Sequence, residues 1–189
     1  MAPLLLPLLA VLMAVGGFLW LGSWAKTTVV VLVRHAEASV AASGDPELSP
    51  AGEKRVATLG AVLTELLVDR KVDYLYAADT RRAQQTAAAI ANEFKLPINV
   101  LASSDWSALA SRIRRDHRGQ TVAVVGYAST LPGVVNQLSG AEIAIRDDEY
   151  DSIYVVAIPS PGETRVFRLR YGSPGAAAAK ARPDLKNTP

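Results

Sequence analysis

The chain has 189 residues, of which 50% are apolar and 20% are charged, so its composition excludes a disordered, collagen-like or coiled-coil protein. Its net charge is only +2, and no basic stripe interleaved with aromatic residues occurs, which argues against nucleic acid as a partner. Without cysteine there is no disulfide or thiolate chemistry, and no cluster has the spacing of metal ligands, so we expect no metal or other cofactor.

The first 25 residues are predicted to be a membrane-directed segment, because Ala2 to Ala25 contains no charged residue. A helix of this length would span about 30 Å of hydrocarbon, with Trp20 and Trp24 at the interface. A cleaved signal peptide is the alternative, since Ser23-Trp24-Ala25 has the small residues that signal peptidase prefers, although a basic n-region is missing. Both interpretations predict an exported or membrane-anchored protein of the cell envelope.

The first predicted strand is Val29 to Val33, an apolar run typical of a strand buried on both faces of a sheet. Arg34 and His35 follow at its carboxyl end. In open α/β sheets, ligands bind beyond the carboxyl ends of the strands, so this pair is the first candidate for chemistry.

The rest of the domain alternates helices and strands up to Gly172, and residues 173–189 are interpreted as a flexible tail. The last two strands are expected to form a hairpin at one end of the sheet. Apolar spacing and capping residues predict helices at Pro50 to about Arg70, after Asp79 or Thr80 to near Lys95, after Asp105 to before Gly119, and at Pro132 to Leu138. Strands are predicted at Val72 to Ala77, Ile98 to Leu101, Thr121 to Val125, Ser152 to Ile158 and Thr164 to Arg170.

Two further features suit anion binding. Arg82 lies in the first turn of the second predicted helix, where free backbone N–H groups and the helix dipole attract anions. The loop after the fourth strand, Gly126 to Thr130, is small and polar and leads into a helix. By contrast, we interpret the local basic cluster in the third helix as a solvated helix end, with a functional role as the alternative; it comprises Arg112, Arg114, Arg115 and Arg118.

From about Thr28 to Gly172, the chain resembles a histidine phosphatase of the phosphoglycerate-mutase-like superfamily. The resemblance rests on four motifs in order, which are Val33-Arg34-His35-Ala36-Glu37, Leu48-Ser49-Pro50-Ala51-Gly52, Arg82-Ala83-Gln84-Gln85-Thr86 and Val124-Val125-Gly126. The segment Asp147 to Asp151 also resembles small exported members of the superfamily. The resemblance implies a three-layer α/β/α sandwich with a mostly parallel central sheet, here with an N-terminal hydrophobic helix added.

The resemblance also implies a phosphoric monoester hydrolase in which His35 is the nucleophile and forms a phosphohistidine. Arg34 and Arg82 would hold the phosphoryl oxygens of a small phosphorylated substrate. A neutral imidazole is nucleophilic at pH 7, and phosphoryl transfer needs fixed positive charge around the equatorial oxygens. Ser129 and Thr130 are candidates for additional neutral donors, although helix capping explains Ser129 equally well.

The chain departs from the superfamily at Tyr127, where a second histidine is expected. A tyrosine can donate one hydrogen bond, but its phenol supplies no positive charge at pH 7. We therefore expect impaired activity, and the alternative is an inactive phosphate-binding pseudoenzyme. The only other histidine, His117, is interpreted as a surface residue, and Glu37 is the candidate for the acid that protonates the leaving group.

Overall fold

The computed structural model describes residues 13, 26–40 and 44–172, so the predicted membrane-directed segment and the predicted tail lie outside these residues, except for residue 13. Within the described ranges, no helix combines the length and the apolar character needed to cross a bilayer. The described strands are β1 (Lys26–Arg34), β2 (Tyr74–Ala78), β3 (Ile98–Leu101), β4 (Thr121–Gly126), β5 (Ser152–Ser160) and β6 (Arg165–Arg170). The described helices are α2 (Pro50–Leu67), α3 (Arg81–Phe94), the short 3₁₀ helix η1 (Ser103–Asp105), α4 (Trp106–Asp116) and α5 (Leu131–Ser139).

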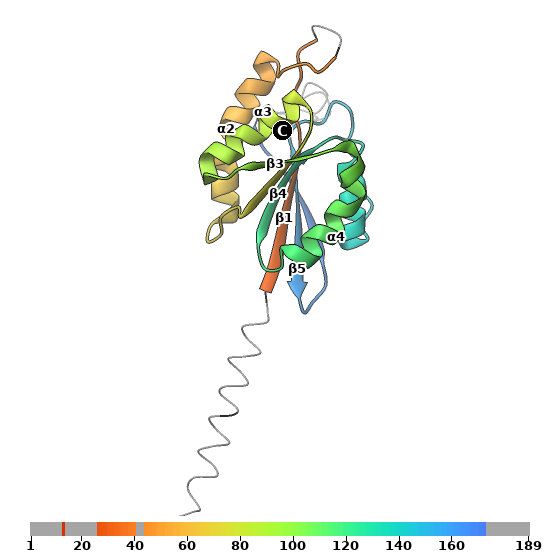
Figure 1. Ribbon diagram of the computed structural model, residues 1–189. Helices are drawn as coiled ribbons and strands as arrows, with labels where there is room; N and C mark the ends of the chain where they lie inside the picture. Colours follow the sequence, from red (N-terminus) through yellow and green to blue (C-terminus); the bar gives the residue numbers. More distant parts are fainter. Residues whose placement is uncertain (1–12, 14–25, 41–43, 173–189) are drawn as a thin grey trace, which may run out of the picture.

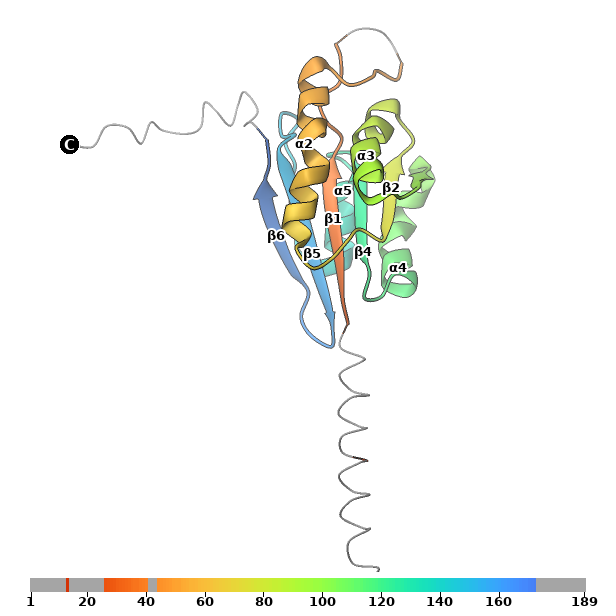
Figure 2. The same cartoon turned by 90° about the vertical axis from the view of Figure 1, so that its left-hand side faces the viewer.

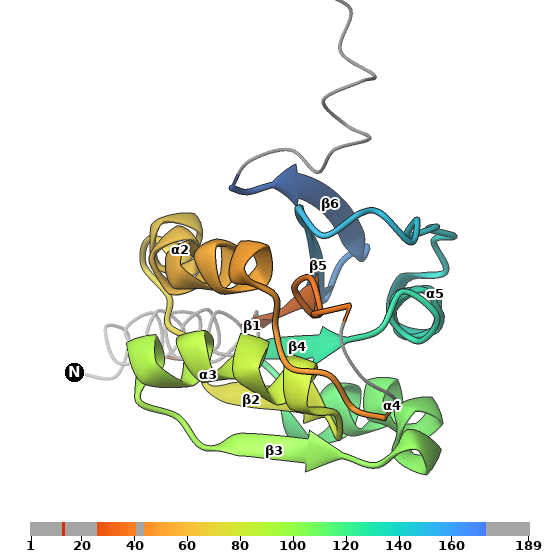
Figure 3. The ribbon, with the colours of Figure 1, turned by 90° about the horizontal axis from the view of Figure 1, so that it is seen from above.

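The six described strands form one mixed sheet in the order β3-β2-β4-β1-β5-β6 (Figures 2 and 3). Strands β3, β2, β4 and β1 run parallel, whereas β5 is antiparallel to β1 and β6 is antiparallel to β5. The continuous apolar run of β1 fits its position, because residues 30–33 are fully buried between β4 and β5. The hairpin predicted at one end of the sheet is confirmed.

Helices cover both faces of the sheet, with α2 and α3 on one side and α4 and α5 on the other (Figures 1 and 3). Each amphipathic helix turns its apolar stripe inward; Leu59 and Leu63 of α2 and Leu109 and Ile113 of α4 are fully buried. Burial of such side chains stabilises the fold by about 1.5 to 3 kcal/mol each. The predicted alternation of helices and strands is therefore confirmed.

Some boundaries differ from the prediction between α2 and β2. Helix α2 ends at Leu67 rather than near Arg70, because Val68 adopts a backbone φ of 38°, which a helix cannot continue. Strand β2 begins at Tyr74 rather than Val72. Val72 is nevertheless only 1% exposed and belongs to the hydrophobic core, so its apolar character reflects core burial rather than strand pairing.

The loop after β1 is held tightly against the start of α2. Ser49 caps the helix by accepting a hydrogen bond from the backbone N–H of Gly52 at 3.1 Å. The N–H of Ser49 donates to the carbonyl of Glu37 at 2.8 Å. A Cβ atom at Gly52 would lie 2.3 Å from that same carbonyl oxygen, so only glycine fits. This packing fixes the backbone immediately after His35.

Candidate active site

His35 is the first residue after β1, and its backbone N–H donates to the carbonyl of Gly126 at the end of neighbouring β4. The residue as a whole is 7% exposed. Its Nδ1 lies 2.8 Å from the carbonyl oxygen of Ala36, which can only accept, so Nδ1 carries the proton. The Nε of Arg82 donates to Nε2 at 3.3 Å. Both contacts select the same tautomer, with the lone pair on Nε2.

The imidazole of His35 is neutral at pH 7. Burial is the main cause that lowers its pKa, from 6.5 to about 4, and the charges of Arg82 and Arg34 lower the pKa further. The hydrogen bond to Ala36 and the charge of Glu37 act in the opposite direction without outweighing burial. A buried neutral imidazole with its lone pair beside an arginine is well suited to attack an electrophile.

We expect nuclear magnetic resonance of the ¹⁵N-labelled chain to show His35 as the Nδ1–H tautomer, titrating near pH 4. Because burial disfavours the charged form, the ring should stay neutral between pH 6.5 and pH 4, where a free imidazole is protonated. The His35→Ala variant assigns the signal against that of His117. A midpoint near 6.5, or a proton on Nε2, would contradict this reading of the site.

Arg82 lies at the start of α3 with its guanidinium beside His35, where an anion would meet both the side chain and the helix N-terminus. The carboxylate of Asp45 already lies there. It accepts a hydrogen bond from the backbone N–H of Arg81 at 2.7 Å, and its other oxygen is 3.7 Å from Nη1 of Arg82. Thr80 is the capping residue, as one predicted alternative, but its side chain makes no capping hydrogen bond.

Asp45 therefore belongs to the site, although sequence reasoning missed it. The only signal was its place in the turn Gly44-Asp45-Pro46, which predicts a loop without showing where the loop folds. A phosphoryl group bound by Arg82 would have to compete with the Asp45 carboxylate for the same positive charge.

Arg34 is buried beside His35, and most of its donors hold the segment before β5. Its Nη1 donates to the carbonyls of Arg146 and Asp147, both at 2.8 Å. Its guanidinium also stacks 4.1 Å from the ring centre of Tyr150. One buried donor, Nε, has no partner among the described residues. Because an unpaired buried donor costs about 1 to 3 kcal/mol, this N–H is a candidate contact for an anion.

Tyr127 follows β4 and packs its ring edge-on against His35, with ring centres 5.9 Å apart. The guanidinium of Arg82 lies 5.6 Å from the centre of the tyrosine ring. The hydroxyl of Tyr127 is directed to the β2–α3 connection, 3.1 Å from Oγ1 of Thr80 and 3.3 Å from a carboxylate oxygen of Asp79. Burial raises the pKa of Tyr127 despite the hydrogen bond with Thr80, so the phenol remains protonated.

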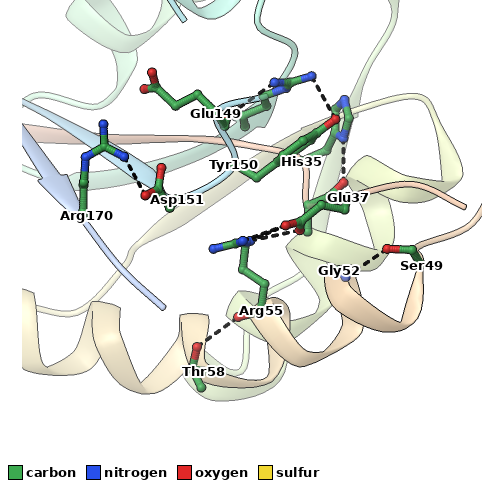
Figure 4. Close-up of polar contacts among 12 residues, drawn as sticks. His35, Glu37, Ser49, Gly52, Arg55, Thr58, Glu149, Tyr150, Asp151 and Arg170 are labelled. Carbon is green, nitrogen blue, oxygen red and sulfur yellow. Dashed lines mark hydrogen bonds and ion pairs between the residues drawn. The ribbon is translucent and has the colours of Figure 1, made fainter. Parts of the chain in front are cut away.

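Glu37 faces Arg55 of α2 rather than His35, and Figure 4 shows the carboxylate turned to the guanidinium. The two side chains form a bidentate pair with contacts of 2.6 to 3.0 Å. Burial is the largest single effect and would raise the pKa of Glu37, but the hydrogen bonds and charge of Arg55, a backbone hydrogen bond and the charge of Arg34 together outweigh it, so the pKa is lowered. Glu37 is thus ionised at neutral pH, which does not fit the proton-donor role predicted for it.

Replacing Glu37 with glutamine should lower the free energy of unfolding by about 1 to 3 kcal/mol, because it removes the carboxylate that forms a bidentate pair with the largely buried Arg55. Since the pKa of Glu37 is lowered on folding, this stabilisation is present above its ordinary value of 4.5 and is lost as pH falls. Urea unfolding at pH 7 and pH 3 measures both effects.

The control for this substitution is Glu47→Gln. Glu47 pairs with Arg81 at 3.2 Å, but both side chains are more than half exposed. Exposed pairs contribute about 0 to 1 kcal/mol. Equal losses in the two variants would show that the Glu37–Arg55 pair has no special structural role.

The remaining candidates lie apart from the imidazole or are otherwise engaged. The Thr130 hydroxyl accepts from the backbone N–H of Tyr127 at 3.2 Å, and Ser129 is exposed. The surface interpretation of His117 is wrong: it is 4% exposed at the opposite end of the sheet, with Nε2 2.8 Å from the hydroxyl of Tyr76. The ring of Tyr74 packs against the same imidazole, with the two ring centres 4.1 Å apart. The sequence signal for this burial was the pair Tyr74 and Tyr76, which point to the same face of β2.

In the part of the chain that the structure describes, no group of three or more histidine, cysteine, aspartate or glutamate residues is arranged to hold a metal ion. The groups at this edge of the sheet include one neutral imidazole, two guanidinium groups and the N-terminus of α3, together with the Asp45 carboxylate and the Tyr127 phenol.

A neutral histidine with two arginines at the carboxyl edge of the parallel strands makes up the candidate anion-binding site of this α/β fold. The model of the histidine phosphatase superfamily (branch 1) matches residues 30–103, which include both arginines and the histidine. The match covers less than half of the chain, and together with the fold it supports an assignment to the histidine phosphatase superfamily.

Solved structures of similar fold share little sequence with the chain. The protein histidine phosphatase SixA, complexed with tungstate, is 16% identical with a TM-score of 0.61, covering 75% of this chain and 96% of SixA. Mycobacterial hydrolase 1 is 14% identical with a TM-score of 0.58, covering 78% and 100% of the two chains. The mycobacterial glucosyl-3-phosphoglycerate phosphatase is 14% identical with a TM-score of 0.55 and the same coverage. Comparison with curated proteins gives no match.

Proposed function

We propose that this protein hydrolyses phosphomonoesters through a phosphohistidine formed on Nε2 of His35. The observation that carries the proposal is the state of that imidazole: it is neutral, its proton is on Nδ1, and its Nε2 lies 3.3 Å from the Nε of Arg82. An anionic phosphoryl group bound to Arg82 would therefore lie next to the lone pair that attacks it.

In the first step, the lone pair of Nε2 forms a bond to phosphorus while the bond from phosphorus to the ester oxygen breaks. The Nε–H of Arg82 leaves Nε2 and donates to a phosphoryl oxygen. The unpartnered Nε–H of Arg34 is a second donor for the developing charge. The carbonyl of Ala36 holds the Nδ1 proton and stabilises the positive ring that forms.

In the second step, water attacks phosphorus and the bond between phosphorus and Nε2 breaks. The electron pair returns to Nε2, which regenerates the neutral imidazole, and inorganic phosphate leaves with the oxygen from water. Because Glu37 is ionised through its pair with Arg55, we infer that esters whose leaving group departs as an anion, such as aryl phosphates, react fastest.

The proposed enzyme is slow because Tyr127 stands where the superfamily places a second histidine. The phenol carries no positive charge, and its hydroxyl bonds to Thr80 and Asp79 rather than facing His35. Loss of one preorganised donor typically lowers a rate by about 100- to 1000-fold.

The second candidate function is a phosphate-binding pseudoenzyme, and the orientation of the Tyr127 hydroxyl favours it. Hydrolysis of an aryl phosphate decides between the two. Turnover that depends on His35 supports the enzyme. Binding of inorganic phosphate without turnover supports the pseudoenzyme, and the absence of both contradicts each proposal.

A further inference from the structure

A cavity of about 430 Å³ lies at the opposite end of the sheet from His35. Its walls come from the start of β1, the end of α4 with the turn that follows it, and the last residues of β5. In Figure 2, the start of β1 and the β5–β6 turn lie at the lower end of the sheet, and the loop after His35 lies at the upper end. Strand β1 has nine residues, so roughly 30 Å of strand separate the two ends.

Three of the side chains that line this cavity are cations, Lys26, Arg114 and Arg118, and none of its lining residues is acidic. None of the three appears in an ion pair with a described carboxylate. Arg118 donates to Oγ of Ser160 at 3.1 Å, and Arg114 donates to the carbonyl of Leu138, so both are oriented by neutral partners. The cavity is therefore a site of uncompensated positive charge.

The position of Lys26 is fixed by the backbone beneath it. Gly119 has a φ of 76°, and a Cβ atom there would lie 2.8 Å from the Cβ and Cδ atoms of Lys26. The N–H of Gly119 donates to Oγ1 of Thr28 at 2.8 Å, which ties this turn to β1. The side chain of Lys26 thus lies on the turn, with the two arginines in the same cavity wall.

The sequence next to the cavity indicates which ligand it binds. Lys26 directly follows Ala2 to Ala25, which contains no charged residue and is interpreted as the membrane-directed segment. A basic cluster at the membrane end of such a segment meets lipid phosphates at headgroup level. We propose that this cavity binds the phosphate headgroup of an anionic phospholipid, and the proposal rests on residues 2–25 lying in a bilayer.

This docking would orient the proposed active site. With the start of β1 at the headgroups, the end that carries His35 points away from the bilayer. The substrate would then come from the aqueous phase or from another protein rather than from the membrane that holds the chain.

The test uses the full chain in a neutral detergent and measures its melting temperature with added short-chain lipids. Dioctanoyl phosphatidylglycerol at saturation should raise the melting temperature by several degrees, because a ligand that binds only the folded state stabilises it. Dioctanoyl phosphatidylcholine, which has the phosphate but no net charge, should raise it less. Arg114→Gln with Arg118→Gln should abolish the difference between the two lipids.

The matched control is Arg112→Gln with Arg115→Gln, which removes the same amount of charge, all of it from α4, but changes no residue of the cavity wall. This variant should keep the full response to phosphatidylglycerol. Arg118→Gln alone, with native mass spectrometry of bound lipid, provides the same test if the double substitution at Arg114 and Arg118 unfolds the protein.

The proposal would be overturned if the two double variants showed the same rise in melting temperature with phosphatidylglycerol, or if the parent chain showed the same rise with both lipids. A response to inorganic phosphate that matches phosphatidylglycerol and disappears in the cavity variant would also overturn it, since the site would then take free phosphate. Binding of phosphate at His35 can be distinguished from binding in the cavity, because substitution of Arg114 and Arg118 leaves the His35 site unchanged. None of these measurements requires catalytic turnover, so the proposal can fail or hold independently of the proposed function.

Discussion

Replacement of His35 by alanine is expected to lower the rate of aryl phosphate hydrolysis by about 10⁴-fold or more, because it removes the nucleophile. The remaining arginines can still bind an anion, so the affinity for inorganic phosphate should change much less than the turnover. An aryl phosphate is the appropriate substrate because its leaving group departs as an anion, and the assay does not depend on a proton donor.

The same experiment identifies the covalent intermediate. Protein quenched in base during turnover should carry an acid-labile phosphoryl group on His35, detected by mass spectrometry of the peptide that contains residues 34–37. The variant should carry none. Turnover that persists in His35→Ala, or phosphate found on another residue, would contradict the proposed mechanism.

His117→Asn is the control for loss of a histidine. His117 is buried at the far end of the sheet, where it contacts Tyr76 and Gln120. Its replacement should lower the melting temperature while the turnover of the folded protein stays within a few-fold of the parent. A loss of activity as large as that of His35→Ala would show that general destabilisation explains both variants.

Tyr127→His is expected to raise the turnover by about 100- to 1000-fold. The tyrosine ring already packs at 5.9 Å from His35, so an imidazole in its place would reach the region beside Nε2 that a phosphoryl group must occupy. Protonated, it would add the positive charge that the phenol lacks. Steady-state kinetics with the same aryl phosphate measures the change.

Tyr127→Phe separates the effect of the new imidazole from loss of the hydroxyl. Because the hydroxyl bonds to Thr80 and Asp79 instead of facing His35, its removal should change turnover by less than about tenfold. If the parent is inert and Tyr127→His is active, the pseudoenzyme is the correct function of the natural chain. If the turnover of Tyr127→Phe falls by as large a factor as the turnover of Tyr127→His rises, the hydroxyl is itself a hydrogen-bond donor to the transition state.

The order of the elements could be predicted from the sequence because the relevant signals are local. The apolar run before Arg34 predicts a buried strand, and the spacing of Leu59 and Leu63 predicts a helix that packs on the sheet. Ser49 caps its helix through a partner only three residues away. The position of His35 at a strand end follows from the same signals.

The environment of each site residue depended on tertiary structure, because its partners are distant in sequence. Glu37 pairs with Arg55 across the start of α2, and Asp45 reaches Arg81 and Arg82 only because the loop crosses the end of β2. Arg34 contacts carbonyls more than 100 positions away. No local pattern encodes such contacts.

The sequence by itself placed Arg34 and His35 at the end of a buried strand and Arg82 in the first turn of a helix, since strand ends and helix starts follow from hydrophobic periodicity and capping. Only the tertiary structure decided their chemical states. Burial makes His35 neutral, Arg55 keeps Glu37 ionised, and the β2–α3 connection takes the hydroxyl of Tyr127. Protonation and hydrogen bonding depend on the groups that surround a side chain in space, and long-range packing brings those groups together.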